Sequence, residues 1–108
     1  MTSYNLGPLE QDIMDCVWKE NEVTVGMVHK CLKKRRKIAY TTVMTIMTRL
    51  TDKGFLVRSK DNKAFLYFPR KTKEQTAKSV INRIVNSLVD QYGKEAVTAF
   101  TDELEKLK

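Results

Sequence analysis

A row of short side chains with hydroxyl and methyl groups recurs at helical spacing near the middle of this chain. The row consists of Thr41, Met44, Thr45 and Thr48, which lie at i, i+3, i+4 and i+7. A hydroxyl can donate to or accept from a base edge, and a methyl can pack on the C5 methyl of thymine. Both groups are short enough for a helix backbone to enter a major groove. This chemistry predicts a nucleic-acid recognition surface, and the alternative is a threonine face that packs on another part of the protein.

The helix that would carry this row is predicted over residues 39–54. Threonine is a middling helix former because its branched Cβ loses rotamer freedom, so several threonines in one helix imply a selection other than helix stability. Thr41 or Thr42 is expected to cap the start of the helix, and Gly54 is expected to end it. An apolar stripe on the opposite side predicts burial against a core. This stripe is formed by Val43, Ile46, Met47 and Leu50.

The chain has 108 residues and is basic, with 20 Lys and Arg against 13 Asp and Glu and a formal net charge of +7. This excess favours a polyanionic partner. A cationic run stands directly before the threonine helix, where phosphates would lie if that helix entered a groove. The alternative is a solvated helix end whose cations interact with the helix dipole. The cationic run consists of Lys30, Lys33, Lys34, Arg35, Arg36 and Lys37.

Residues for catalysis, metal binding or membrane insertion do not form the patterns that those functions require. No nucleophile stands with a base, no Gly-rich phosphate loop occurs, and Asp12 with Asp15 is typical of the wet side of a helix, so no enzyme is predicted. Cys16 and Cys31 form no CxxC pair and His29 stands alone, so neither a metal nor another cofactor is expected. Two core-lining thiols in a reducing cytoplasm are favoured over a disulfide. No apolar run approaches the roughly 20 residues of a membrane span, and no signal-peptide pattern occurs, which predicts a cytoplasmic protein without a membrane partner.

Two helices are predicted before the threonine helix. The first runs from about Pro8 to Lys19, and Trp18 is expected to anchor the core from it. The second begins after Thr24, which is a good N-cap residue, and turns three aliphatic residues inward. These residues are Val25, Val28 and Leu32.

After the threonine helix the hydrophobic period changes from that of a helix to that of a strand. Residues 55–60 and 64–68 are rich in aromatic and β-branched residues and are joined by a polar turn, so they predict a β-hairpin. Arg58, Lys60 and Lys63 crowd its tip and one face, either to protect a strand edge or to form a basic wing against a nucleic-acid backbone. Three helices and a hairpin predict a mainly α winged helix-turn-helix domain over residues 1–70, which favours the groove-reading role of the threonine helix.

Residues 71–108 predict a helical dimerisation region. A capping-box pattern at residues 72–75 starts a long helix to about Tyr92, and Gly93 separates it from a last helix. Both helices are amphipathic, and their apolar area exceeds what the small winged core could cover, so they need a partner, most simply a second copy of the chain. The alternative is that they fold back on the first helix within one monomer. The expected interface residues are Ala77, Ile81, Ile84, Leu88, Val97, Phe100 and Leu104.

One pattern of motifs extends over nearly the whole chain, from about residue 6 to 108. It begins with Leu6-Gly7-Pro8-Leu9-Glu10 and is most specific at Tyr40-Thr41-Thr42-Val43, followed by Arg49-Leu50 and Lys53-Gly54. The pattern resembles the BlaI/MecI/CopY family of bacterial repressors. The resemblance implies a homodimeric winged-helix transcriptional repressor that binds an inverted-repeat operator in double-stranded DNA.

The same resemblance implies a division of labour among the residues at the DNA. For the bases it implies Thr41, Thr42, Met44 and Thr45. For the DNA backbone it implies part of the cationic run, the flanks of the threonine helix and the wing. These backbone residues are Lys34, Arg35, Arg36, Lys37, Tyr40, Thr48, Arg49, Arg58, Lys60 and Lys63.

Two features depart from that family. Penicillinase repressors are released by proteolysis at an Asn-Phe bond, whereas the matching place here reads Ala99-Phe100, so this sequence does not predict cleavage-driven release. The copper-responsive members carry a C-terminal cysteine cluster, whereas no cysteine follows Cys31, so copper sensing is not expected. Two other functions fit the same elements: a winged-helix module that binds another protein, and a DNA-binding regulator with a small-molecule pocket.

Overall fold

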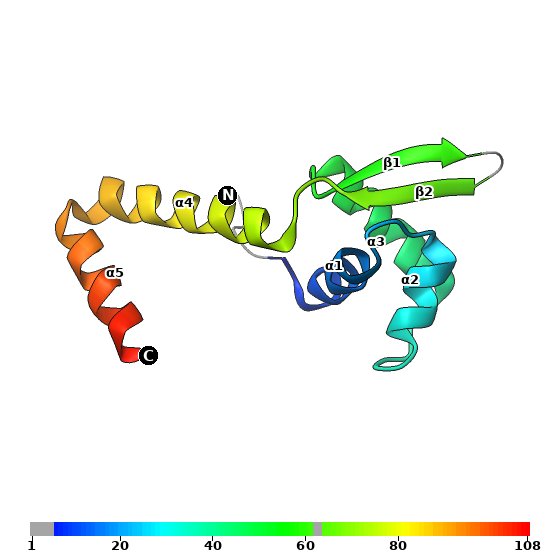
Figure 1. The fold of residues 1–108 in the computed structure, drawn as a ribbon, viewed down its shortest axis with the longest axis horizontal. Helices are drawn as coiled ribbons and strands as arrows, with labels where there is room; N and C mark the ends of the chain where they lie inside the picture. The colour runs from blue at the N-terminus through cyan, green and yellow to red at the C-terminus, as the bar shows by residue number, and fades with distance from the viewer. Residues whose placement is uncertain (1–5, 62–63) are drawn as a thin grey trace. The chain divides into compact units, whose positions relative to one another are not determined.

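The computed structural model describes residues 6–61 and 64–108, and the described chain divides into two compact units, Leu6–Lys73 and Glu74–Lys108. The first unit contains the helices α1 (Pro8–Glu20), α2 (Val25–Leu32) and α3 (Tyr40–Asp52) and the antiparallel strands β1 (Leu56–Asp61) and β2 (Ala64–Pro69) (Figure 1). The second unit contains α5 (Glu95–Lys106) and nearly all of α4 (Lys73–Tyr92). The predicted mainly α fold with a winged helix-turn-helix order is confirmed.

A single hydrophobic core lies among the three helices and the hairpin of the first unit. The predicted inward faces of α2 and α3 both contribute to it, although Ile46 is only partly buried. Because one stripe of α3 is committed to this core, the opposite stripe is left outside. The residues with 1% exposure or less are Ile13, Met14, Val17, Val23, Val28, Leu32, Val43, Met47, Leu50, Leu56 and Tyr67.

Local signals determine the ends of α2 and α3. The Thr24 hydroxyl accepts a hydrogen bond from the Met27 N–H at 3.2 Å, which confirms the predicted N-cap of α2. Gly54 has φ = +88° and ends α3, also as predicted, because a side chain at this left-handed position would be strained.

The predicted threonine cap of α3 is wrong. The N-cap residue is Ala39, which has no side-chain cap, and its carbonyl accepts from the N–H groups of Thr42 at 3.1 Å and Val43 at 3.2 Å. Thr41 and Thr42 therefore lie inside the first turn of the helix, so their hydroxyls are placed on its outer surface instead of at its end.

A backbone pairing that the sequence does not reveal attaches the hairpin to the segment between α1 and α2. The N–H of Val23 donates to the Tyr67 carbonyl at 3.0 Å, and the N–H of Tyr67 donates to the Val23 carbonyl at 2.8 Å. Trp18 packs against the core and is partly buried, and its indole N–H donates to the Lys71 carbonyl at 3.0 Å. These bonds fix the wing relative to α1.

Cys16 and Cys31 form a disulfide between α1 and α2, which corrects the expectation of two free thiols. The helices pack so that the two Cα atoms are 6.4 Å apart, which is within the range that a disulfide spans. Sequence alone could not decide this, because the residues are 15 positions apart and on different helices. The bond adds a covalent link to the hydrophobic contacts between the two helices.

The start of α1 and the end of α3 are joined by the carboxylate of Glu10. It accepts from the Gly7 N–H at 3.0 Å and pairs with the Lys53 ammonium at 2.7 Å. The bond from Lys53, followed by the bond from Gly7, lowers the pKa of Glu10. Since a lowered pKa means that folding favours the ionised form, the stabilisation is present above the unfolded pKa of Glu10 and is lost as the pH falls through the lower folded pKa.

We expect Glu10→Gln to lower the free energy of unfolding by about 1 kcal/mol at neutral pH, because half of the Lys53 side chain is solvated and the pair is screened. Urea titrations at neutral pH and at about pH 3 measure this, and the difference from the wild type should shrink at the acidic pH. The matched control is Glu22→Gln, which removes an exposed carboxylate that has no ion pair among the described residues. A difference of the same size at both pH values would contradict the assignment.

Helices α4 and α5, which the structure describes in full, contain no buried residue. Gly93 separates them with φ = +80°, and its N–H donates to the Val89 carbonyl at 2.8 Å. Roughly half of the surface of several apolar side chains stays exposed, including Ile81, Val97 and Leu104. No helix among the described residues is both long and apolar enough to cross a bilayer.

Candidate nucleic-acid interface

The outer face of α3 is open to solvent. Thr41, Thr42, Met44 and Thr45 are all exposed, whereas Thr48 is half-buried. Met44 keeps 43% of its surface exposed, which is unusual for a large apolar side chain in a helix that already has a buried stripe. The alternative of a threonine face packed on the protein is therefore not what the first unit adopts. Contact of these four residues with bases remains a prediction.

Two of the hydroxyl groups on this side of α3, those of Thr45 and Thr48, have the same orientation. Thr45 Oγ1 donates to the Thr41 carbonyl at 2.9 Å, and Thr48 Oγ1 donates to the Met44 carbonyl at 3.0 Å. Because the hydroxyl hydrogens of these two threonines are used within the helix, their oxygens offer lone pairs outward and their methyl groups stay available. Such a surface suits base edges that donate, the exocyclic amines of adenine and cytosine, together with the thymine methyl. The sequence alone left donation and acceptance equally open.

The cationic run occupies the end of α2 and the turn before α3, and its members differ in their partners. Lys34 and Lys37 are exposed and make no ion pair within residues 6–61 and 64–108. Arg35 and Arg36 instead pair with Asp12 of α1, at 3.4 Å and 2.5 Å between nitrogen and oxygen. Sequence reasoning missed the role of Asp12, because its partners lie 23 and 24 residues away along the chain.

A histidine fixes the segment that leads into α3. His29 Nε2 lies 2.8 Å from the Ile38 carbonyl, and since a carbonyl only accepts, this nitrogen carries the hydrogen. The His29 and Tyr40 rings also form a T-shaped pair, with centroids 5.8 Å apart and planes at 86°. His29 thus positions Tyr40, which is 48% exposed at the first residue of α3.

The wing presents a cation supported by an aromatic ring. The guanidinium of Arg58 lies 4.4 Å from the centre of the Phe65 ring. Arg58 and Lys60 are two residues apart on β1, so their side chains share one face of the hairpin, and Phe65 stands opposite Lys60 in the strand register. No sequence pattern indicates that Phe65 holds Arg58. Lys63, the third predicted wing residue, lies outside the described residues.

Arg49 completes the predicted set of backbone contacts on α3. It is exposed and follows Thr45 by four residues, which places it one helical turn further along the same outer face. The described part of α3 and its flanks therefore brings together exposed threonines, one exposed methionine and several cations.

A second candidate surface belongs to the unit Glu74–Lys108. Ala77, Ile81, Val97 and Leu104 are exposed, and the other predicted interface residues, Ile84, Leu88 and Phe100, are half-buried. Between α4 and α5 lies an open, almost wholly apolar groove of about 440 Å³. It is lined by Leu88, Tyr92, Glu95, Ala96, Ala99, Phe100 and Glu103. No group of three metal-ligating side chains occurs among the residues that the structure describes.

Comparison with known proteins places this chain in a family. A family model described as the penicillinase repressor matches residues 6–108. The chain belongs to the penicillinase repressor family. This membership confirms the resemblance that the sequence motifs indicated.

Two relatives of this chain match it over different lengths. The transcriptional regulator BlaI of Mycobacterium tuberculosis is 45% identical over 65 residues, which are 59% of this chain and 47% of that protein. The chain thus spans about half the length of this relative. The methicillin resistance regulatory protein MecI of Mammaliicoccus sciuri is 30% identical over 114 residues, covering 98% of this chain and 92% of that protein.

Solved structures support the winged fold of this penicillinase repressor family member. The monomeric form of Bacillus licheniformis BlaI, solved in complex with the blaP half-operator, matches with a TM-score of 0.56 and 27% identity, over 65% of this chain and 85% of that one. A MarR family protein from Bacillus stearothermophilus matches with a TM-score of 0.58 over 96% of this chain and 74% of that one. At 20% identity, the second match shows the fold alone.

Proposed function

We propose that this chain is a sequence-specific DNA-binding transcriptional repressor that acts as a homodimer on an inverted-repeat operator. The observation that carries the proposal is the solvent-open face of α3, in which Thr41, Thr42, Met44 and Thr45 stand beside exposed cations. Membership of the penicillinase repressor family and the likeness to a BlaI structure with half-operator DNA support the same function. The protein would act in the cytoplasm, where bacterial DNA is located.

In this proposal α3 enters the major groove with its threonine face toward the base edges. Tyr40, Thr48, Arg49, the exposed lysines of the cationic run and the wing contact the flanking phosphates, which fixes the register of α3 on the duplex. The Thr45 oxygen accepts a hydrogen bond from an exocyclic amine, because its own hydrogen is held by the Thr41 carbonyl. Repression follows when the bound protein blocks access of the polymerase.

The homodimer is supported by the surface of α4 and α5. Helices of this size draw most of their stability from packing of an apolar face, yet neither helix has a buried residue in the single chain. A second copy offers an identical apolar surface, and a two-fold pair closes on itself. We therefore assign the residues after the winged domain, predicted as 71–108, to dimerisation and the residues before them to DNA binding.

Selection of bound duplexes from a random oligonucleotide pool tests the proposal. We expect an enriched motif with two-fold symmetry, whose half-sites are centred about 10 base pairs, or one duplex turn of roughly 34 Å, or a multiple of it apart. No enrichment would contradict sequence-specific binding, and a single asymmetric motif would contradict the dimer. A pool in which the enriched positions are rich in thymine and in bases with exocyclic amines would agree with the orientation of the threonine hydroxyls.

The groove between α4 and α5 supports a second candidate, a DNA-binding regulator that responds to an apolar small molecule. Its volume of about 440 Å³ falls within the range of ligand pockets. We favour the symmetric pair as the occupant of this groove, because exposed apolar residues of both helices, such as Ile81 and Leu104, lie outside its lining and also need a partner. A change of DNA affinity caused by an apolar compound, without a change of oligomeric state, would favour the regulator.

A further inference from the structure

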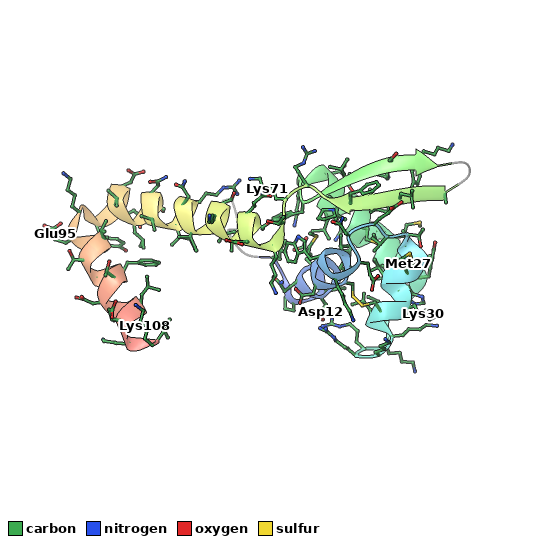
Figure 2. All side chains as sticks on the ribbon, viewed as in Figure 1. Asp12, Met27, Lys30, Lys71, Glu95 and Lys108 are labelled. Carbon is green, nitrogen blue, oxygen red and sulfur yellow. A yellow bond between two sulfur atoms is a disulfide. The ribbon has the colours of Figure 1, made fainter. Side chains whose placement is uncertain are left out.

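A carboxylate on α1 holds two members of the cationic run. Oδ1 of Asp12 accepts from Arg35 Nη1 at 3.4 Å, and Oδ2 accepts from Arg36 Nη2 at 2.5 Å. Figure 2 shows Asp12 on the side of α1 that faces the loop following α2. Each carboxylate oxygen of Asp12 therefore accepts from a different guanidinium.

This arrangement resembles the way in which two arginines hold a phosphate. The planar fork of a guanidinium suits carboxylate and phosphate oxygens alike, so an acidic side chain and a DNA backbone compete for the same donors. With Asp12 ionised, the three side chains carry a net charge of +1 in place of the +2 of the two arginines alone. Asp12 thus halves the charge that this part of the surface presents to a polyanion.

The exposures of the three side chains allow such an exchange. Asp12 is fixed on a helix with 19% of its side chain exposed, whereas Arg35 and Arg36 follow α2 in a turn with 57% and 38% exposed. Because both guanidinium groups are exposed and neither arginine belongs to the core, the arginines can leave Asp12 without unfolding the protein. Lys34 and Lys37, which have no ion pair among the described residues, are already available. The cationic run therefore contains free cations and held cations side by side.

We propose that Asp12 is an intramolecular competitor of the DNA phosphates, which sets the strength of DNA binding by holding Arg35 and Arg36 on the protein surface. The inference rests on the proposed DNA-binding function. Asp12 itself touches no base, so it lowers the affinity for operator and non-operator duplexes alike. Sequence discrimination then depends more on the contacts of α3 than on a strong attraction to any duplex.

The test compares Asp12→Asn with the wild type, both as the full chain. The affinity for a fluorescein-labelled duplex of mixed sequence is measured by anisotropy over a range of salt concentrations. We expect the variant to bind about tenfold more tightly, and its log–log salt dependence to be steeper by about one to two phosphate contacts per protomer. The matched control is Glu20→Gln, which makes the same change in net charge on the same helix, removes no ion pair among the described residues and leaves both arginines paired.

A thermodynamic cycle shows whether Asp12 acts through the arginines. In a background of Arg35→Gln with Arg36→Gln, the change Asp12→Asn should leave the affinity within about twofold, because no held cation remains to be released. Unchanged or weaker binding of Asp12→Asn in the wild-type background would overturn the proposal, and so would an equal gain in the Glu20→Gln control.

A second pair of variants keeps the proposal open to contradiction if Asp12→Asn does not fold. Arg35→Gln with Arg36→Gln should weaken binding less than Lys34→Gln with Lys37→Gln, because the arginines first have to leave Asp12. An equal or larger loss from the arginine pair would overturn the role of Asp12. If the wild type bound neither this duplex nor the duplexes recovered by selection, the proposed DNA-binding function would fail. If the wild type bound DNA but its affinity did not change on substitution of Asp12, only the role of Asp12 would fail.

Discussion

Replacement of Thr45 by glutamate is expected to weaken binding to the selected operator by more than about a hundredfold, because like charges placed together in an interface cost several kcal/mol. Thr45 lies in the middle of the open face of α3, and its hydroxyl offers lone pairs to base amines. A carboxylate at this position would lie among the hydrogen-bond acceptors of the bases and the phosphates, and it would lose its hydration. Anisotropy titrations with the selected operator and with a duplex of mixed sequence measure the loss.

The fold should not change, because residue 45 is exposed and contributes nothing to the core. Thermal melting followed by circular dichroism verifies this. The control is Thr98→Glu, which introduces the same charge at an exposed position of α5, away from the face of Val97 and Phe100. Operator affinity that stays the same in Thr45→Glu, or that falls equally in Thr98→Glu, would contradict the assignment of the recognition face.

Much of the fold could be predicted because the local and the tertiary requirements agree. The stripe of Val43, Met47 and Leu50 has the period of a helix, and the same residues are the ones that the core needs. Likewise, Thr24 and Gly54 have side-chain and backbone chemistry that is sufficient by itself to begin or end a helix. At these positions a short stretch of sequence is enough to predict the local structure.

Apart from the N-cap of α3, the features that sequence reasoning missed depend on which distant segments meet. The pairing of Val23 with Tyr67 uses backbone groups, which leave no mark in the side-chain pattern. The bond between Cys16 and Cys31 and the pairing of Asp12 with two arginines depend on how α1 packs against α2. Periodicity predicts that these helices are buried on one face, but it does not predict the rotation that brings particular side chains together.

The same limit applies to the candidate site. The exposed residues of α3 could be named from spacing alone, whereas the division of the cationic run into free and held members could not. α1 provides the carboxylates that hold cations before and after α3. Asp12 holds Arg35 and Arg36 before α3, and Glu10 holds Lys53 after it. The carboxylates of α1 therefore hold residues on both sides of α3, although the sequence pattern predicted only that Asp12 faces solvent.

The change Ile81→Asp is expected to separate the proposed homodimer. In the single chain Ile81 is 49% exposed on α4, so the substitution removes no core contact and should leave each protomer folded. In a two-fold interface each copy contributes the same residue, so one substitution buries two unpaired carboxylates. We expect the dissociation constant of the dimer to rise by more than about a hundredfold, since an uncompensated buried charge costs about 3–5 kcal/mol.

Sedimentation velocity over a range of protein concentrations measures this change, with Asn82→Asp as the control, because it adds one charge at the neighbouring exposed position of the same helix. The variant should also bind a half-site with the affinity of the wild type, since α3 is unchanged, while losing the advantage of two linked half-sites on the full operator. Loss of half-site binding would mean that α4 supports the winged domain directly. An unchanged sedimentation coefficient would mean that the apolar face of α4 is covered by something other than a second copy.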